Sequence, residues 1–157
     1  AHIAINIALE ANVKLLLAGK VVQGHEEYFN EYINPKLSAR IQYIGEIGMK
    51  RKAKLMAEAL GLINPILYDE PFGLVMAESL MSGTPVLALK RGASAEIVEH
   101  RRTGFVGESN EELLEGVLHI GTICRNTCRT EAIRKFNIER MAREHLTVYR
   151  NAMDYRS

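Results

Sequence analysis

The sequence predicts a Rossmann-like α/β fold, in which a parallel sheet carries helices on both faces. Short apolar runs alternate along the chain with longer segments of helical period. Two of the runs, residues 13–18 and 85–89, are almost continuously apolar, which is typical of strands buried on both faces of a parallel sheet. Glycine follows several expected strands, as at Gly19, Gly45 and Gly92, and indicates loops at one edge of the sheet.

Composition favours one soluble globular domain over residues 1–157, because 47% of the residues are hydrophobic and 25% are charged. The formal net charge of +1 gives no general attraction to nucleic acid. The sequence has no run of about 18 apolar residues that could cross a bilayer, and its start lacks the layout of a signal peptide. We therefore expect a cytoplasmic protein.

The two cysteines, Cys124 and Cys128, lie in a segment of helical period. The histidines are scattered, so cysteine and histidine do not form a set of metal ligands at the spacing of a zinc finger. We expect reduced thiols and no bound metal.

The first expected elements are a helix over residues 1–11, a strand over 13–18 and a loop over 19–24. The helical period has no cap before it, so the chain is expected to begin inside an element. The loop follows the carboxyl end of a strand, where ligands collect in open α/β sheets. Gly19 and Lys20 are therefore candidate site residues, and a plain turn is the equal alternative.

An amphipathic helix over residues 26–33 and a strand over 40–44 come next, followed by an exit loop over 45–48. A helix is then expected over residues 49–60. Leucine, methionine and alanine give this helix an apolar inner face, and the basic cluster from Lys50 to Lys54 is expected to be solvated.

The stretch from Tyr68 to Pro85, YDEPFGLVMAESLMSGTP, carries the clearest chemistry. It follows an apolar strand over residues 62–67 and opens with a turn that contains Glu70. In that turn Pro71 fixes one backbone dihedral and Gly73 frees another, so the backbone can approach a ligand.

A helix over residues 74–82 follows the turn and is apolar on almost every side, so we expect it to be buried. Its one charge is Glu78. A carboxylate in such a helix needs a partner, and no basic residue lies one turn away on the same helix.

The start of this helix is suited to a phosphorylated sugar. The amides of Phe72, Gly73 and Leu74 should be free at the helix start, where the dipole favours an anion. Carboxylates such as Glu70 and Glu78 accept hydrogen bonds from sugar or ribose hydroxyls. The chemistry indicated is a sugar linked through phosphates to a nucleoside.

Beyond the helix the sequence predicts a strand over residues 85–89, a turn at 92–94 with a short helix, and a strand over 103–107. Ser94 either caps the short helix or contacts the ligand. Ser109 should cap a further helix. Two amphipathic helices, over residues 124–136 and 138–153, complete the chain.

The string from Glu70 to Pro85, with its two glutamates, its Pro-Phe-Gly turn and its Gly-Thr-Pro end, resembles a known motif. It is similar to the donor-binding motif of retaining nucleotide-sugar glycosyltransferases of GT-B architecture, the glycosyl transferases group 1, or family 4, type. The resemblance extends over most of the chain and includes residues 4–8, the Ala18-Gly19 strand end, Tyr43-Ile44-Gly45, 93–98 and Thr103-Gly104-Phe105.

The resemblance implies the carboxy-terminal, donor-binding half of such an enzyme. Glu78 would bind the ribose. Glu70 would be the catalytic residue and would bind the donor sugar. The amides of Phe72, Gly73 and Leu74 would contact the sugar and phosphate. Gly45 and Ile47 would lie near the nucleobase, chiefly through backbone contacts. No metal or other cofactor is implied.

The resemblance also implies that this chain is a fragment. A first strand, a basic loop for the diphosphate and an acceptor-binding domain would precede it, and the last helix would pack toward that domain. The isolated chain is then expected to bind nucleotide weakly and to transfer no sugar. Association with a membrane surface through the upstream domain is possible in such enzymes.

Three alternatives remain at the level of sequence. The chain could belong to another enzyme class of the same architecture, such as a nucleotide-sugar epimerase or a phosphorylase. It could be a binding module without catalysis. In the third alternative, the chain is a plain α/β domain in which Glu70 and Glu78 serve only as ion-pair partners of lysine or arginine.

Overall fold

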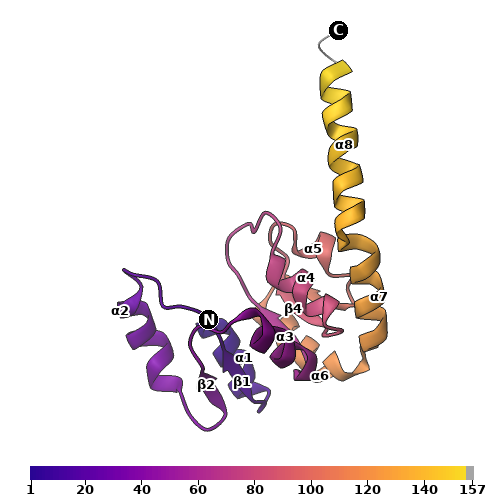
Figure 1. The fold of residues 1–157 in the computed structure, drawn as a ribbon. Coiled ribbons are helices and arrows are strands. Elements are labelled where there is room, and N and C mark those ends of the chain that lie inside the picture. The colour runs from indigo at the N-terminus through magenta and orange to yellow at the C-terminus, as the bar shows by residue number, and fades with distance from the viewer. Residues whose placement is uncertain (155–157) are drawn as a thin grey trace.

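The computed structural model describes residues 1–154 and contains short parallel strands that alternate with helices (Figure 1). In chain order the elements are α1 (His2–Glu10), β1 (Leu15–Leu17), α2 (Glu26–Tyr28), the π-helix η1 (Phe29–Ile33), the 3-10 helix η2 (Asn34–Lys36), β2 (Ile41–Tyr43), α3 (Met49–Glu58), β3 (Leu62–Asn64), α4 (Leu74–Met81), β4 (Val86–Leu89), α5 (Ser94–Ile97), β5 (Gly104–Gly107), α6 (Asn110–His119), the 3-10 helix η3 (Ile120–Thr122), α7 (Arg125–Phe136) and α8 (Ile138–Asp154).

The strands form two parallel sheets. One contains β1 and β2, paired with Leu15 opposite Ile41. The other has the order β3-β4-β5, with Val86 of β4 between Leu62 of β3 and Gly104 of β5. The α/β class, the parallel direction and the order of elements predicted from the sequence are confirmed, but the expected single sheet is divided in two.

The core lies on both faces of β4, whose four residues are all buried. Val86 and Ala88 point to a cluster that contains residues of α4 and α7, such as Leu80 and Cys128. Leu87 and Leu89 belong to a second cluster with residues of α1 and α6. Since successive side chains of a strand alternate between its faces, β4 has helices on both faces, as predicted.

The strand β1 is not buried on both faces, so that part of the prediction is wrong. Leu16 is 48% exposed, whereas Leu15 and Leu17 pack against a third cluster that includes Ile5 of α1 and Ile41 of β2. The continuous apolar run gave no sign of this difference. Its cause is tertiary, because β1 has only β2 as a partner and only one of its faces is covered by the described chain.

The helix α8 extends away from the α/β body in Figure 1. Its apolar side chains gather on one side of the helix and are exposed, among them Ile138, Met141, Leu146, Val148, Tyr149 and Met153. Within residues 1–154, no helix combines the length and the apolar character needed to cross a membrane.

Candidate functional site

Glu70 lies in the turn between β3 and α4, at the carboxyl edge of the three-stranded sheet. The Tyr68 hydroxyl donates a hydrogen bond to Oε2 of Glu70 at 2.8 Å. The pKa of Tyr68 is raised, chiefly because its hydroxyl proton is held by this carboxylate. The Glu70 side chain is thus oriented by an aromatic hydroxyl two residues before it.

A second loop holds the backbone of this turn. The amide of Ala93 donates to the carbonyl oxygen of Glu70 at 2.9 Å, and the amide of Gly92 donates to Oδ1 of Asp69 at 3.0 Å. The loop after β4 therefore fixes the position of Glu70 from the neighbouring strand.

Gly73 is the residue immediately before α4, and its φ of 78° lies in the left-handed region. A Cβ atom at this position would overlap the end of the Met76 side chain and come within 3.3 Å of Cγ of Glu70. Only glycine fits here without strain. Within residues 1–154, the amides of Phe72, Gly73 and Leu74 donate no hydrogen bond to another loop, turn or cap, so they are available at the start of α4.

The helix α4 is less buried than the sequence predicts. Its inner residues Met76, Ala77, Ser79 and Leu80 are buried, but Leu74 is 70% exposed. The prediction of burial on every side is wrong at the first residue, because Leu74 lies at the open edge of the sheet. The Phe72 ring is also partly exposed and packs edge to face on Phe136 of α7, with centroids 5.9 Å apart.

Glu78 has the partner that its position requires, and that partner comes from the neighbouring helix. Nζ of Lys52 in α3 lies 2.6 Å from Oε1 and 2.8 Å from Oε2 of Glu78. The two side chains are 33% and 39% exposed, so the pair can be reached from solvent. Lys52 was expected to be solvated with its neighbours, and that prediction is wrong for this one lysine.

Lys52 could have been found from the sequence. It precedes Leu55 and Met56 by three and four residues, and residues so spaced share one face of a helix. It is therefore the lysine of its cluster that the helical period places on the inner face. Tyr68 was also missed, and no pattern in the sequence indicates that it bonds Glu70.

Gly19 and Gly45 are brought together at the ends of β1 and β2. The Gly19 amide donates to the Gly45 carbonyl at 3.0 Å, and the Tyr43 hydroxyl donates to the Gly19 carbonyl at 2.7 Å. Ile47 is half-buried in the same exit loop, and Lys20 is exposed. In the described part of the chain, no hydrogen bond or ion pair links these residues directly to Glu70 or Glu78.

Ser94 does not cap α5, so that interpretation is wrong. The N-cap position is Ala93, and the buried Ser94 hydroxyl instead accepts a hydrogen bond from the Arg91 amide at 3.0 Å. This bond closes the turn that holds Glu70. The predicted cap of α6 is confirmed, since the Ser109 hydroxyl accepts from the Glu112 amide at 3.2 Å.

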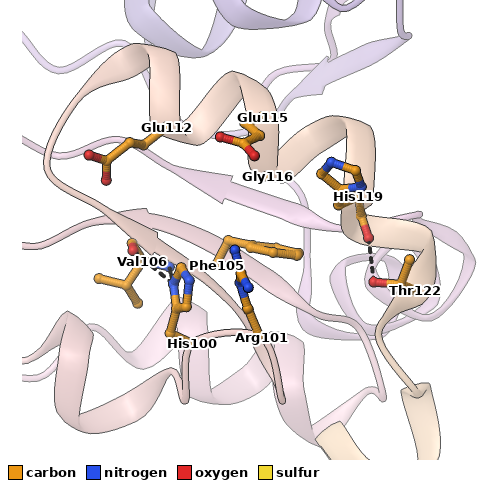
Figure 2. Close-up of a pocket in the computed structure, with 9 residues that line it drawn as sticks. All are labelled: His100, Arg101, Phe105, Val106, Glu112, Glu115, Gly116, His119 and Thr122. Atoms are coloured by element: carbon orange, nitrogen blue, oxygen red, sulfur yellow. Dashed lines mark hydrogen bonds between the residues drawn. The ribbon is translucent and has the colours of Figure 1, made fainter.

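Two cavities lie away from Glu70 and Glu78. One of about 490 Å³ runs beside β5. Figure 2 shows Phe105 between the acidic side chains of α6, Glu112 and Glu115, and the basic side chains of His100 and Arg101. The other, of about 620 Å³, lies at the carboxyl ends of β4 and β5 and has Lys90 and Arg91 in its lining. Neither Glu70 nor Glu78 lines these two cavities.

Comparison with known proteins shows which family this chain matches. The family described as "Glycosyl transferases group 1" matches residues 2–122. A glycosyltransferase of Methanocaldococcus jannaschii, MJ1607, is 26% identical over 153 residues, which are 91% of this chain and 38% of that protein. A D-inositol 3-phosphate glycosyltransferase of a Nocardioides species is 29% identical over 119 residues, or 71% of this chain and 26% of that protein.

A solved structure shares the fold. The crystal structure of Anabaena Alr3699/HepE in complex with UDP has a TM-score of 0.81 at 23% identity, covering 96% of this chain and 44% of that one. The chain therefore spans less than half the length of each of these proteins.

Proposed function

Because this chain belongs to the glycosyl transferases group 1 family, we propose that it is the donor-binding half of a retaining glycosyltransferase. In this proposal it holds a nucleoside-diphosphate sugar while a hexosyl group passes to an acceptor hydroxyl. The observation that carries the proposal is the arrangement around α4. Glu70 precedes the free amides at the start of α4, those of Phe72, Gly73 and Leu74. Glu78 lies one turn farther along α4.

Each residue of this arrangement has a role in the proposal. Glu78 accepts hydrogen bonds from the ribose hydroxyls, and Glu70 accepts them from the hydroxyls of the donor sugar. The amides of Phe72, Gly73 and Leu74 contact the sugar and the phosphates, because a helix start favours an anion. Preorganised donors of this kind stabilise the charge that develops on a departing diphosphate.

The nucleobase would lie at the ends of β1 and β2. Gly19, Lys20, Gly45 and Ile47 surround this edge, and the bond between Gly19 and Gly45 holds the two loops together. Their contacts to the base would be made chiefly by backbone groups. We propose no metal and no further cofactor for the transfer.

The complete enzyme would need a second domain. We propose that a preceding segment supplies a strand between β1 and β3, a basic loop for the diphosphate and the acceptor site. The exposed apolar side of α8 would then pack on that domain. We place the complete protein in the cytoplasm, with contact to a membrane surface, if any, made by the upstream domain.

Sugar transfer distinguishes this proposal from its alternatives. A nucleotide-sugar epimerase would convert the donor without an acceptor, and a binding module would hold the donor unchanged. The first experiment is a thermal-shift panel of UDP-, GDP- and ADP-sugars on this chain, since a ligand that binds the folded state raises the melting temperature. No shift with any donor would contradict the proposal.

The second experiment compares sugar transfer by this chain and by a longer protein with the upstream domain restored. Only the longer protein should turn over, because a cleft between two domains is needed to align the reacting groups and exclude water. Equal turnover by both would overturn the two-domain proposal, and donor conversion without an acceptor would favour the epimerase.

A further inference from the structure

The pair of Lys52 and Glu78 joins two helices whose positions are fixed independently of it. Arg125 of α7 donates to the carbonyls of Ala57 and Ala59 at the end of α3, each at 2.7 Å. Arg129, one turn later, donates to the carbonyl of Met81 at the end of α4 at 2.6 Å. Because α7 is bonded to the ends of both helices, the backbones of α3 and α4 hold Lys52 and Glu78 near each other.

The ammonium contacts both oxygens of the carboxylate. Each carboxylate oxygen has two lone pairs, so one lysine leaves acceptor capacity on both Oε1 and Oε2. The Glu78 side chain is 39% exposed, which leaves that capacity open to a ligand. Two adjacent acceptors match two adjacent hydroxyls, such as the 2′ and 3′ hydroxyls of a ribose.

We propose that Lys52 is a positioning residue that makes this site selective for a ribonucleotide over its 2′-deoxy counterpart. The inference rests on the proposed function, since it assigns the ribose to Glu78. By contacting both oxygens, Lys52 fixes the rotation of the carboxylate and compensates its charge in a largely apolar helix. Without Lys52 the carboxylate turns, and the two hydroxyls no longer meet two acceptors together.

Lys54 offers a matched control on the same helix. Its side chain is 74% exposed, and its ammonium lies 3.9 Å from Glu58, one turn away. A change at Lys54 removes the same charge from α3 but touches neither Glu78 nor α4. Effects of net charge alone would therefore be equal for the two lysines.

The experiment measures dissociation constants of UDP, GDP and ADP, and of their 2′-deoxy forms, by calorimetry. The proteins are the unchanged chain and its variants Lys52→Met, Lys52→Gln, Lys52→Arg and Lys54→Met. We expect the chain to prefer a ribonucleotide by about tenfold, as the loss of a hydrogen bond to a charged group predicts. Lys52→Met and Lys52→Gln should reduce this preference to about twofold, while Lys52→Arg and Lys54→Met should keep most of it.

The preference for a ribonucleotide over its 2′-deoxy form shows whether Lys52 positions Glu78 or only stabilises the fold. A structural role alone would lower the melting temperature of the ligand-free protein without changing the ratio of the two affinities. An unchanged ratio in the Lys52 variants overturns the inference, and so does an equal fall in Lys54→Met. If the unchanged chain binds none of these nucleotides, the proposed function itself fails. If it binds them and the Lys52 variants keep the preference, only the role of Lys52 fails.

Discussion

Gly92 packs directly on the backbone of Glu70, so that a Cβ atom at Gly92 would overlap both the carbonyl oxygen and the amide nitrogen of Glu70. Gly92 also has a φ of 49°, in the left-handed region. The two loops that meet here follow adjacent parallel strands, β3 and β4. The backbone of Glu70, the catalytic candidate, can therefore take this position only because Gly92 has no side chain.

The first prediction is that Gly92→Ala displaces the Glu70 turn. The overlap must be relieved by movement of backbone, and overpacking of this kind costs about 1–3 kcal/mol. The melting temperature should fall by about 2–4 °C per kcal/mol for a domain of this size. Binding of a nucleotide-sugar should weaken more than binding of the bare nucleoside diphosphate, because Glu70 faces the sugar in our proposal.

Gly121→Ala is the control for this prediction, since nothing lies within 4 Å of a Cβ atom built at Gly121. It should leave both affinities unchanged. Equal behaviour of the two alanine variants, in melting and in binding, would contradict the role assigned to Gly92.

The second prediction concerns Glu78→Gln, which keeps the shape of the side chain and removes its charge. Affinity for a nucleoside diphosphate should fall about tenfold or more, as expected for the loss of a charge-assisted hydrogen bond. The fold should persist, because both partners of the ion pair are partly exposed and such pairs contribute little to stability. Calorimetry and thermal unfolding measure the two effects separately. Unchanged affinity would rule out the ribose role.

The third prediction is that Glu70→Ala weakens binding of the sugar part of the donor and not of its nucleoside-diphosphate part. Affinity for the bare nucleoside diphosphate should stay within about twofold, whereas the added affinity contributed by the sugar should be lost. Tyr68→Phe is the companion variant, since it removes the hydroxyl that orients Glu70 and keeps the ring. It should cause a smaller loss of the same kind. If both ligands weaken equally in Glu70→Ala, the division of roles between Glu70 and Glu78 is wrong.

The sequence was most informative where chemistry is local. The burial of Val86 to Leu89 on both faces follows from a continuous apolar run, the Ser109 cap from its spacing, and the need of Glu78 for a partner from the cost of a charge in an apolar helix. Each is confirmed. The exposure of Leu16 depends on which elements pack on the two faces of β1 and could not be found from its own segment.

The site shows the same limit. Glu70 and Gly73 were identified from their turn, but the contact of Gly92 with Glu70 joins loops more than twenty positions apart, and only the strand order brings them together. The helical period places Lys52 on the inner face of α3, but only the packing of α3 beside α4 brings it to Glu78. Sequence thus indicated which groups could bind a donor, while the groups that position them depend on tertiary packing.

The last prediction concerns stability in acid. Glu99 accepts hydrogen bonds from Lys135 at 2.5 Å and from Arg102 at 2.7 Å, and its side chain is 29% exposed. The hydrogen bond from Lys135 is the main reason why the pKa of Glu99 lies below its ordinary value of 4.5. The folded protein then holds this proton less tightly than the unfolded chain does.

The sign of the pH dependence follows from linkage. The stabilisation from Glu99 is complete above about pH 5 and is lost as the pH falls below 4.5 toward the lowered pKa of the folded state. Glu99→Gln should therefore cost about 1 kcal/mol of unfolding free energy near neutral pH, a value reduced by solvent screening. The difference from the unchanged protein should shrink as the pH falls below 4.5. Urea unfolding across this range measures it, with Glu27→Gln, at an exposed position of α2, as the control. A difference that stays constant with pH would show that Glu99 stabilises the fold by packing and not by its charge.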